Sequence, residues 1–142
     1  RELKRLATIR RIVLDTMKEF NIKIVMAHNT RFDYRSTATT QRYMTNSKYR
    51  YFFPYGTEFW DTLKMAREVL KADEEYENFC YENNYLTKRG CRRYTAEILY
   101  RFFTNDNDFV ESHTGLEDVM IEKEILARCF RQHKPMRKKL FE

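Results

Sequence analysis

The stretch IKIVMA at residues 22–27, followed by His28, Asn29 and Thr30, decides the fold class. These six residues are mostly apolar and rich in β-branched side chains, which is typical of a strand buried on both faces of a parallel sheet. The chain leaves this strand at its carboxyl end, where ligands bind in open α/β sheets. The sequence therefore predicts an α/β fold with a ligand site beside His28 and Asn29.

Helical periodicity surrounds this strand, because apolar residues recur at three- and four-residue spacing before and after it. We expect helices over residues 2–20, 33–46, 62–71, 74–84, 95–103 and 115–132. An aromatic hairpin or extended edge is expected over residues 49–60, a turn over residues 105–108 and a basic tail over residues 134–139. No interior boundary breaks this pattern, so residues 1–142 are expected to form a single domain.

The amino-acid composition indicates which kinds of molecule the protein would bind. The 142 residues are 42% hydrophobic and 34% charged, with a net charge of +6. Apolar residues are numerous enough for a core, and their mixing with charged residues argues against disorder. The basic balance favours a polyanionic partner, nucleic acid first and an anionic membrane surface second. A soluble domain that happens to be basic is an equally good interpretation.

Cysteine usage and hydropathy indicate the compartment. Cys80, Cys91 and Cys129 form no C-x-x-C pair, and their odd number and wide spacing predict reduced thiols in a cytoplasmic protein. No apolar run approaches the roughly 20 residues that span a membrane, so we expect no membrane partner. The sequence begins at Arg1 rather than Met, which suggests a fragment of something longer.

Two acids stand near expected helix starts, each after a histidine. Asp33 follows the strand at residues 22–27 by a short loop, and Asp118 opens the last helix five residues after His113. Alone, each acid is an ordinary helix-start residue that complements the helix dipole. His113 lies in a polar segment and can serve as a general base at neutral pH, although a surface histidine capping the helix is the plain alternative. Acids on two helix ends can converge on one pocket and hold a divalent metal.

The order of these motifs resembles the DEDDh-type 3′-5′ exonucleases, the proofreading-type exonucleases of the ribonuclease H-like superfamily. The matching segments are A-H-N-x-x-F-D at residues 27–33, W-D-T-L-x-x-A at residues 60–66 and H-x-x-L-x-D at residues 113–118. Each motif alone is weak, but their order, spacing and placement on a strand and helices make the match specific. The resemblance covers residues 22–130.

This resemblance implies a metal-dependent 3′-5′ exonuclease that hydrolyses phosphodiester bonds of DNA or RNA with Mg²⁺ or Mn²⁺. Asp33 and Asp118 would hold the metals, and His113 would be the general base that deprotonates the attacking water. Of two such ions, one lowers the pKa of water and the other stabilises the leaving oxygen. The motif residues expected to contact the substrate are His28, Asn29 and Phe32.

The chain departs from the family at the first motif, an Asp-x-Glu on a strand that is followed by two antiparallel strands. No Asp-x-Glu follows an apolar strand here, and Asp73, Glu74 and Glu75 fall in a charged linker. We therefore expect the carboxyl-terminal part of a ribonuclease H-like fold, with weak metal binding and little activity alone. The missing strands would come from an upstream segment or a second chain. The alternatives are a catalytically inactive nucleic-acid-binding module and a polymerase-associated subunit that contacts a DNA polymerase.

Cations and rings alternate around Lys48 and Arg50, with aromatic residues at positions 49 and 51–53. Such interleaving suits single-stranded or 3′-end DNA, because bases stack on rings and phosphates pair with cations. An edge strand with core aromatics and solvated cations is an equally good interpretation. Lys48 and Arg50 are therefore candidate substrate-binding residues.

Overall fold

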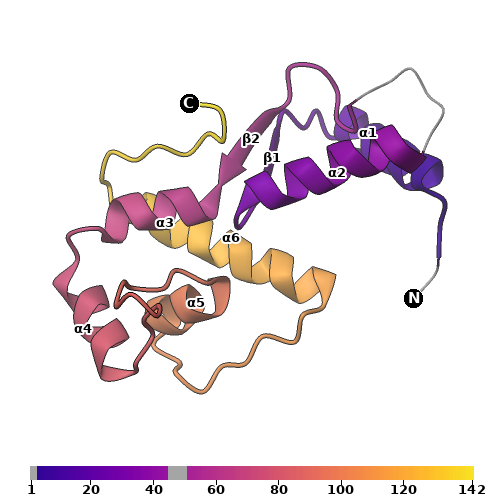
Figure 1. Cartoon of the computed structure of the whole chain (residues 1–142). Coiled ribbons are helices and arrows are strands. Elements are labelled where there is room, and N and C mark those ends of the chain that lie inside the picture. The colour runs from indigo at the N-terminus through magenta and orange to yellow at the C-terminus, as the bar shows by residue number, and fades with distance from the viewer. Residues whose placement is uncertain (1–2, 45–50) are drawn as a thin grey trace.

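The computed structural model describes residues 3–44 and 51–142, which form a helix-rich α/β arrangement (Figure 1). The helices are α1 (Leu6–Glu19), α2 (Thr30–Met44), α3 (Thr62–Leu70), α4 (Glu74–Glu82), α5 (Ala96–Thr104) and α6 (Gly115–Arg131). The strands are β1 (Ile24–Ala27) and β2 (Glu58–Asp61). The mixed α/β class predicted from the sequence is thus confirmed. Within the described residues, no helix is both long and apolar enough to cross a membrane.

The two strands pair in parallel, with Ile24 opposite Glu58 and Ala27 opposite Asp61. Both strands therefore end at the same edge, beside the turn at residues 28 and 29. The prediction that residues 22–27 are buried on both faces is wrong, because Ile22 and Ile24 are 37% and 41% exposed. The reason is the size of the sheet: within the described residues β1 pairs only with β2, so its other edge has no strand beside it.

In the described part of the segment that the sequence assigned to a hairpin or extended edge, residues 51–60, only residues 58–60 are in a strand, and they begin β2. A turn with Gly56 at φ 85° precedes β2, and the amide of Glu58 donates to the carbonyl of Lys23 at 2.9 Å. The expected basic tail also has structure. Trp60 pairs with Lys139 in an antiparallel bridge, and the amide of Asp61 donates to the carbonyl of Lys138 at 2.8 Å. The carboxyl-terminal segment thus lies along β2.

Helix α2 begins at Thr30, three residues earlier than the sequence predicted. The Thr30 side chain is buried, and its hydroxyl donates to the carbonyl of Trp60 at 2.5 Å while accepting from the amide of Ala27 at 3.1 Å. This hydroxyl therefore fixes the helix start against the ends of both strands. As a consequence, Asp33 lies within the first turn of α2 rather than at its boundary.

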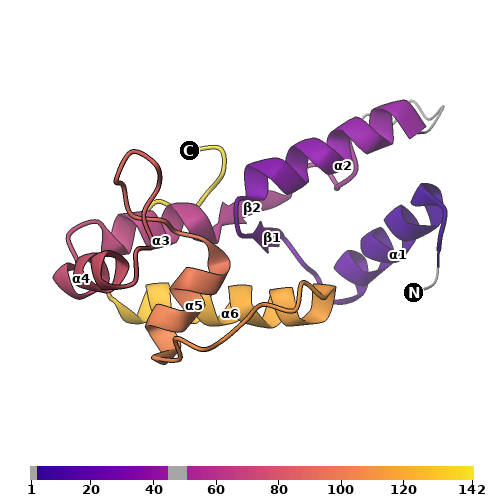
Figure 2. The same ribbon diagram turned by 60° about the horizontal axis from the view of Figure 1, so that its bottom comes forward.

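The core lies among the helices that follow β2, where α6 packs against α3 and α5. Its fully buried members include Met65, Leu70, Tyr76, Leu99, Ile125 and Cys129. Figures 1 and 2 show α1 and α2 at the opposite end of the molecule from α4. Helix α1 buries only Met17, so it adds little to this core. The junction between the core and the small sheet is where the candidate site lies.

Candidate acidic site

His28 ties the end of β1 to three other segments. Its backbone amide donates to a Glu122 carboxylate oxygen at 3.1 Å, Nδ1 lies 2.9 Å from the Thr62 hydroxyl, and Nε2 lies 2.7 Å from the Tyr94 carbonyl. Burial lowers the pKa of His28, which favours the neutral ring. A neutral ring here donates from Nε2 to the carbonyl and accepts at Nδ1 from Thr62. Both ring nitrogens are therefore engaged within the protein.

Asn29 and Asp61 form the next contact at this corner. Asn29 has a left-handed backbone with φ 65°, and its amide donates to the Asp61 carboxylate at 3.0 Å. The same Asp61 oxygen accepts from the amide of Leu63 at 3.0 Å and so caps α3. Asp61 is buried, whereas Asn29 is exposed. Asp61 belongs to the W-D-T-L segment, to which the sequence analysis assigned no chemical role.

Asp33 lies in the first turn of α2, with its side chain at the surface. Its pKa is raised, mainly by partial desolvation and further by the negative charge of Asp61. When a second carboxylate raises the pKa of an acid, a cation that approaches the pair stabilises the ionised form of that acid. Asp33 and Asp61 thus contribute negative charge at the carboxyl ends of the two strands.

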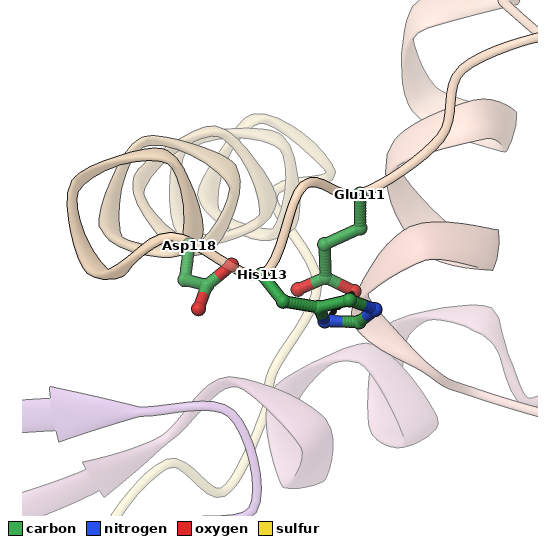
Figure 3. A group of neighbouring side chains, drawn as sticks. All are labelled: Glu111, His113 and Asp118. Carbon is green, nitrogen blue, oxygen red and sulfur yellow. Dashed lines mark ion pairs between the residues drawn. The ribbon is translucent and has the colours of Figure 1, made fainter.

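A second acidic group stands at the start of α6 and contains Glu111, His113 and Asp118 (Figure 3). One possible ligand atom from each lies within 4.8 Å of the others, so these residues could hold a metal ion. His113 Nδ1 is 3.9 Å from a Glu111 carboxylate oxygen, and its side chain is 79% exposed. Burial raises the pKa of Glu111, and the neighbouring Asp118 raises it further. One Asp118 oxygen is buried and has no hydrogen-bond partner among the described residues.

Glu122 connects the two acidic groups. It lies one turn after Asp118 on α6, is half-buried, and accepts the hydrogen bond from His28 described above. Burial raises the pKa of Glu122, and the charges of Asp33, Asp118 and Glu111 raise it further. Asp33 and Asp118, which are 85 positions apart in the sequence (118 minus 33), therefore act on one shared carboxyl group.

Glu111 and Glu122 are not among the site residues predicted from the sequence, although Glu111 is a negative neighbour of His113 in the sequence. The available signal for Glu122 was its spacing from Asp118, since residues four apart lie on the same side of a helix. Among the predicted substrate contacts, Asn29 and Phe32 are exposed, and Phe32 is 67% exposed. Lys48 and Arg50 lie outside the described residues. The structure thus groups His113 and Asp118 with Glu111, while Asp33 and Asp118 both raise the pKa of Glu122.

Comparisons of the chain with protein family models, curated proteins and solved structures give no match.

Proposed function

We propose that the protein is a metal-dependent 3′-5′ exonuclease that hydrolyses phosphodiester bonds of DNA or RNA. In this proposal the described chain is the carboxyl-terminal part of a ribonuclease H-like fold. The observation that carries the proposal is the position of Glu122, whose pKa is raised by both Asp33 and Asp118. Acids from the first turns of α2 and α6 thus share one electrostatic environment, and the amide of His28 at the end of β1 binds Glu122 at 3.1 Å.

The residues present fit a hard divalent cation such as Mg²⁺ or Mn²⁺. Oxygen ligands surround Mg²⁺ at about 2.0–2.1 Å, so opposite ligands are about 4.2 Å apart. A carboxylate oxygen of Glu111 and one of Asp118 lie within 4.8 Å of each other, close to the separation of two ligands on one ion. The buried Asp118 oxygen without a partner is of the kind that a cation would satisfy. When bound, the metal would supply an acidified water and positive charge at the phosphate.

The protein side chains would supply the proton transfer. His113 is exposed at the edge of the acidic group, where a water molecule and a substrate can reach its ring. In the proposed step the water oxygen bonds to phosphorus, its proton passes to His113, and the bond from phosphorus to the 3′ oxygen breaks. The terminal nucleotide leaves as a 5′-monophosphate, and the 3′ oxygen of the shortened strand takes up a proton from solvent to become a hydroxyl. Glu111, at 3.9 Å from Nδ1, would stabilise the protonated ring. Asp33 and Asp118 would be the metal ligands.

A second candidate function is a nucleic-acid-binding module that does not hydrolyse its ligand, on its own or beside a polymerase. This function is favoured by the small number of possible metal ligands, because neither described strand contains an Asp-x-Glu pair. The conserved chemistry of a two-metal site needs carboxylates on both sides of the phosphate. This function predicts binding to DNA without release of nucleotides.

A nuclease assay separates these two functions. The protein expressed from its complete reading frame is incubated with 5′-labelled single-stranded DNA and either Mn²⁺, Mg²⁺ or a chelator. The proposal predicts a ladder shortened from the 3′ end with either metal, loss of hydrolysis in Asp33→Asn/Asp118→Asn, and retention in the matched α1 variant Asp15→Asn/Glu19→Gln. Intact DNA with both metals, together with measurable DNA binding, would establish the second function instead.

A further inference from the structure

The surface around Asn29 carries three adjoining hollows, each of which includes Asn29 in its lining. The first, of about 600 Å³, runs along α2 past Arg31 and Arg35. The second, of about 810 Å³, lies over α3 and contains Arg31 and Arg67. The third, of about 400 Å³, contains Arg67 and Arg93. Neighbouring hollows share an arginine as well as Asn29, and the three together are called here the arginine groove.

The four arginines of this groove have exposed side chains that bind no carboxylate in the described part of the protein. The guanidinium of Arg67 lies over the Tyr94 ring, 5.9 Å from its centre, and within the described residues it pairs with no carboxylate. Other cations nearby have structural roles: Arg137 pairs with Glu68 at 2.7 Å, and Arg92 donates to the carbonyl of Lys71 at 2.9 Å. The groove arginines are therefore available to an external anion.

Spacing along α2 strengthens this argument. Arg31 and Arg35 are four residues apart, so their side chains lie on the same side of the helix. Like charges at this spacing repel one another and destabilise a helix unless an anion neutralises them. A ligand with successive negative charges, such as a phosphate backbone, would relieve the repulsion along the groove.

An exposed ring in the same groove specifies the kind of polyanion. Phe32 belongs to the lining of the first hollow and is 67% exposed. An exposed aromatic ring beside cations can stack on an unpaired base, whereas the bases of a duplex are already stacked on each other. At Asn29 the charge changes sign, because the Asn29 amide binds Asp61 and Asp33 follows four residues later.

We propose that the arginine groove binds a single-stranded nucleic acid, with its phosphates on Arg31, Arg35, Arg67 and Arg93 and a base stacked on Phe32. The strand would pass Asn29, which lines all three hollows and binds Asp61, so that a phosphodiester of the strand lies beside the acidic site. The placement of a phosphodiester at the acidic site rests on the proposed function, whereas the binding of the single strand to the arginine groove does not.

Fluorescence anisotropy with a labelled oligothymidylate in excess chelator measures this binding without cleavage. For Arg31→Gln/Arg67→Gln we expect at least about a tenfold loss of affinity at moderate salt, because two phosphate contacts disappear. The slope of log K against log salt should become less steep by about 1.4, since each contact on a single strand contributes about 0.7. Phe32→Leu should weaken binding about tenfold with an unchanged salt slope.

The control is Lys123→Gln/Arg131→Gln, which removes the same charge from exposed positions of α6 outside the groove. It should keep the affinity within about twofold of the parent protein. Arg35→Gln/Arg93→Gln is a second groove pair, which tests the proposal even if the first pair unfolds. Equal weakening by the groove pair and the control pair would overturn the proposal, because binding would then follow net charge alone.

The outcomes also separate this inference from the hydrolysis proposal. Groove-dependent binding without nucleotide release in Mn²⁺ or Mg²⁺ would support the groove and remove the exonuclease. Hydrolysis by the parent protein, together with full affinity in the variants of both groove pairs, would support the exonuclease and overturn the groove. A duplex probe that loses affinity in Phe32→Leu as strongly as the single strand would overturn the base-stacking assignment.

Discussion

The carboxylate of Glu122 accepts a hydrogen bond from the backbone amide of His28 at 3.1 Å. This bond joins the second turn of α6 to the end of β1, two segments that are far apart in the sequence. The pKa of this half-buried acid is raised by Asp33 on α2 and by Asp118 on α6, so acids of two helices contribute charge to one region.

Glu122→Gln should raise the free energy of unfolding at neutral pH. An acid with a raised pKa binds more protons in the folded than in the unfolded protein. The free energy of unfolding therefore falls as the pH rises from the pKa of the unfolded protein through that of the folded protein. Glutamine removes the charge, and its side-chain oxygen can still accept from His28. Thermal unfolding at several pH values checks this, with Glu19→Gln on α1 as the control. The gain should disappear in acid, and a gain of equal size at every pH would contradict the electrostatic explanation.

His113→Ala in the full-length protein should lower the hydrolysis rate by about 10²–10⁴-fold, the usual contribution of a general base. Affinity for DNA should stay nearly the same, because this ring makes no required phosphate contact in the proposed site. Single-turnover rates at saturating Mg²⁺, with affinity measured in chelator, separate the two effects. Turnover equal to that of the parent protein would remove His113 from the mechanism.

Several elements of this fold could be predicted from the sequence because their signals are local. Helix α6 has a clear apolar period, and its acids in the first turn mark its start at Gly115. The start of α2 could not be predicted, because the Thr30 hydroxyl that fixes it binds Trp60, a partner 30 positions away. The surroundings of β1 depended on which strands pair with it, which its own composition does not determine.

The acidic site was only partly predictable for a similar reason. Asp33, His113 and Asp118 stand in recognisable motifs, whereas Glu122 looks like any charged residue on the exposed side of a helix. Its role depends on the tertiary contact with His28 and on the charges gathered around it. Burial and the neighbouring Asp118 likewise raise the pKa of Glu111, and no local sequence pattern predicts either effect.

Leu99→Ala should cost about 2–5 kcal/mol of stability, because it removes a fully buried side chain and leaves a cavity. The matched control is Leu116→Ala on the surface of α6, where the leucine is 78% exposed. That change should alter the free energy of unfolding by less than about 0.5 kcal/mol. Urea unfolding of both variants tests the assignment of the core, and equal losses would show that Leu99 lies outside it.

The outer edge of β1 should drive association. Within the described residues no strand covers it, and exposed Ile22 and Ile24 flank its backbone. An open apolar edge recruits another strand, while a lysine on such an edge discourages pairing. Light scattering of the 142-residue chain should therefore show association that rises with concentration and falls in Ile24→Lys. A stable monomer that is unaffected by this substitution would contradict the expectation.

Calorimetric titration of the protein with Mn²⁺ measures directly whether these acids hold a divalent cation. We expect weak but saturable binding that is lost in Asp33→Asn/Asp118→Asn and kept in the control Asp15→Asn/Glu19→Gln. Binding that is absent from the parent protein, or equal in both double variants, would contradict this expectation.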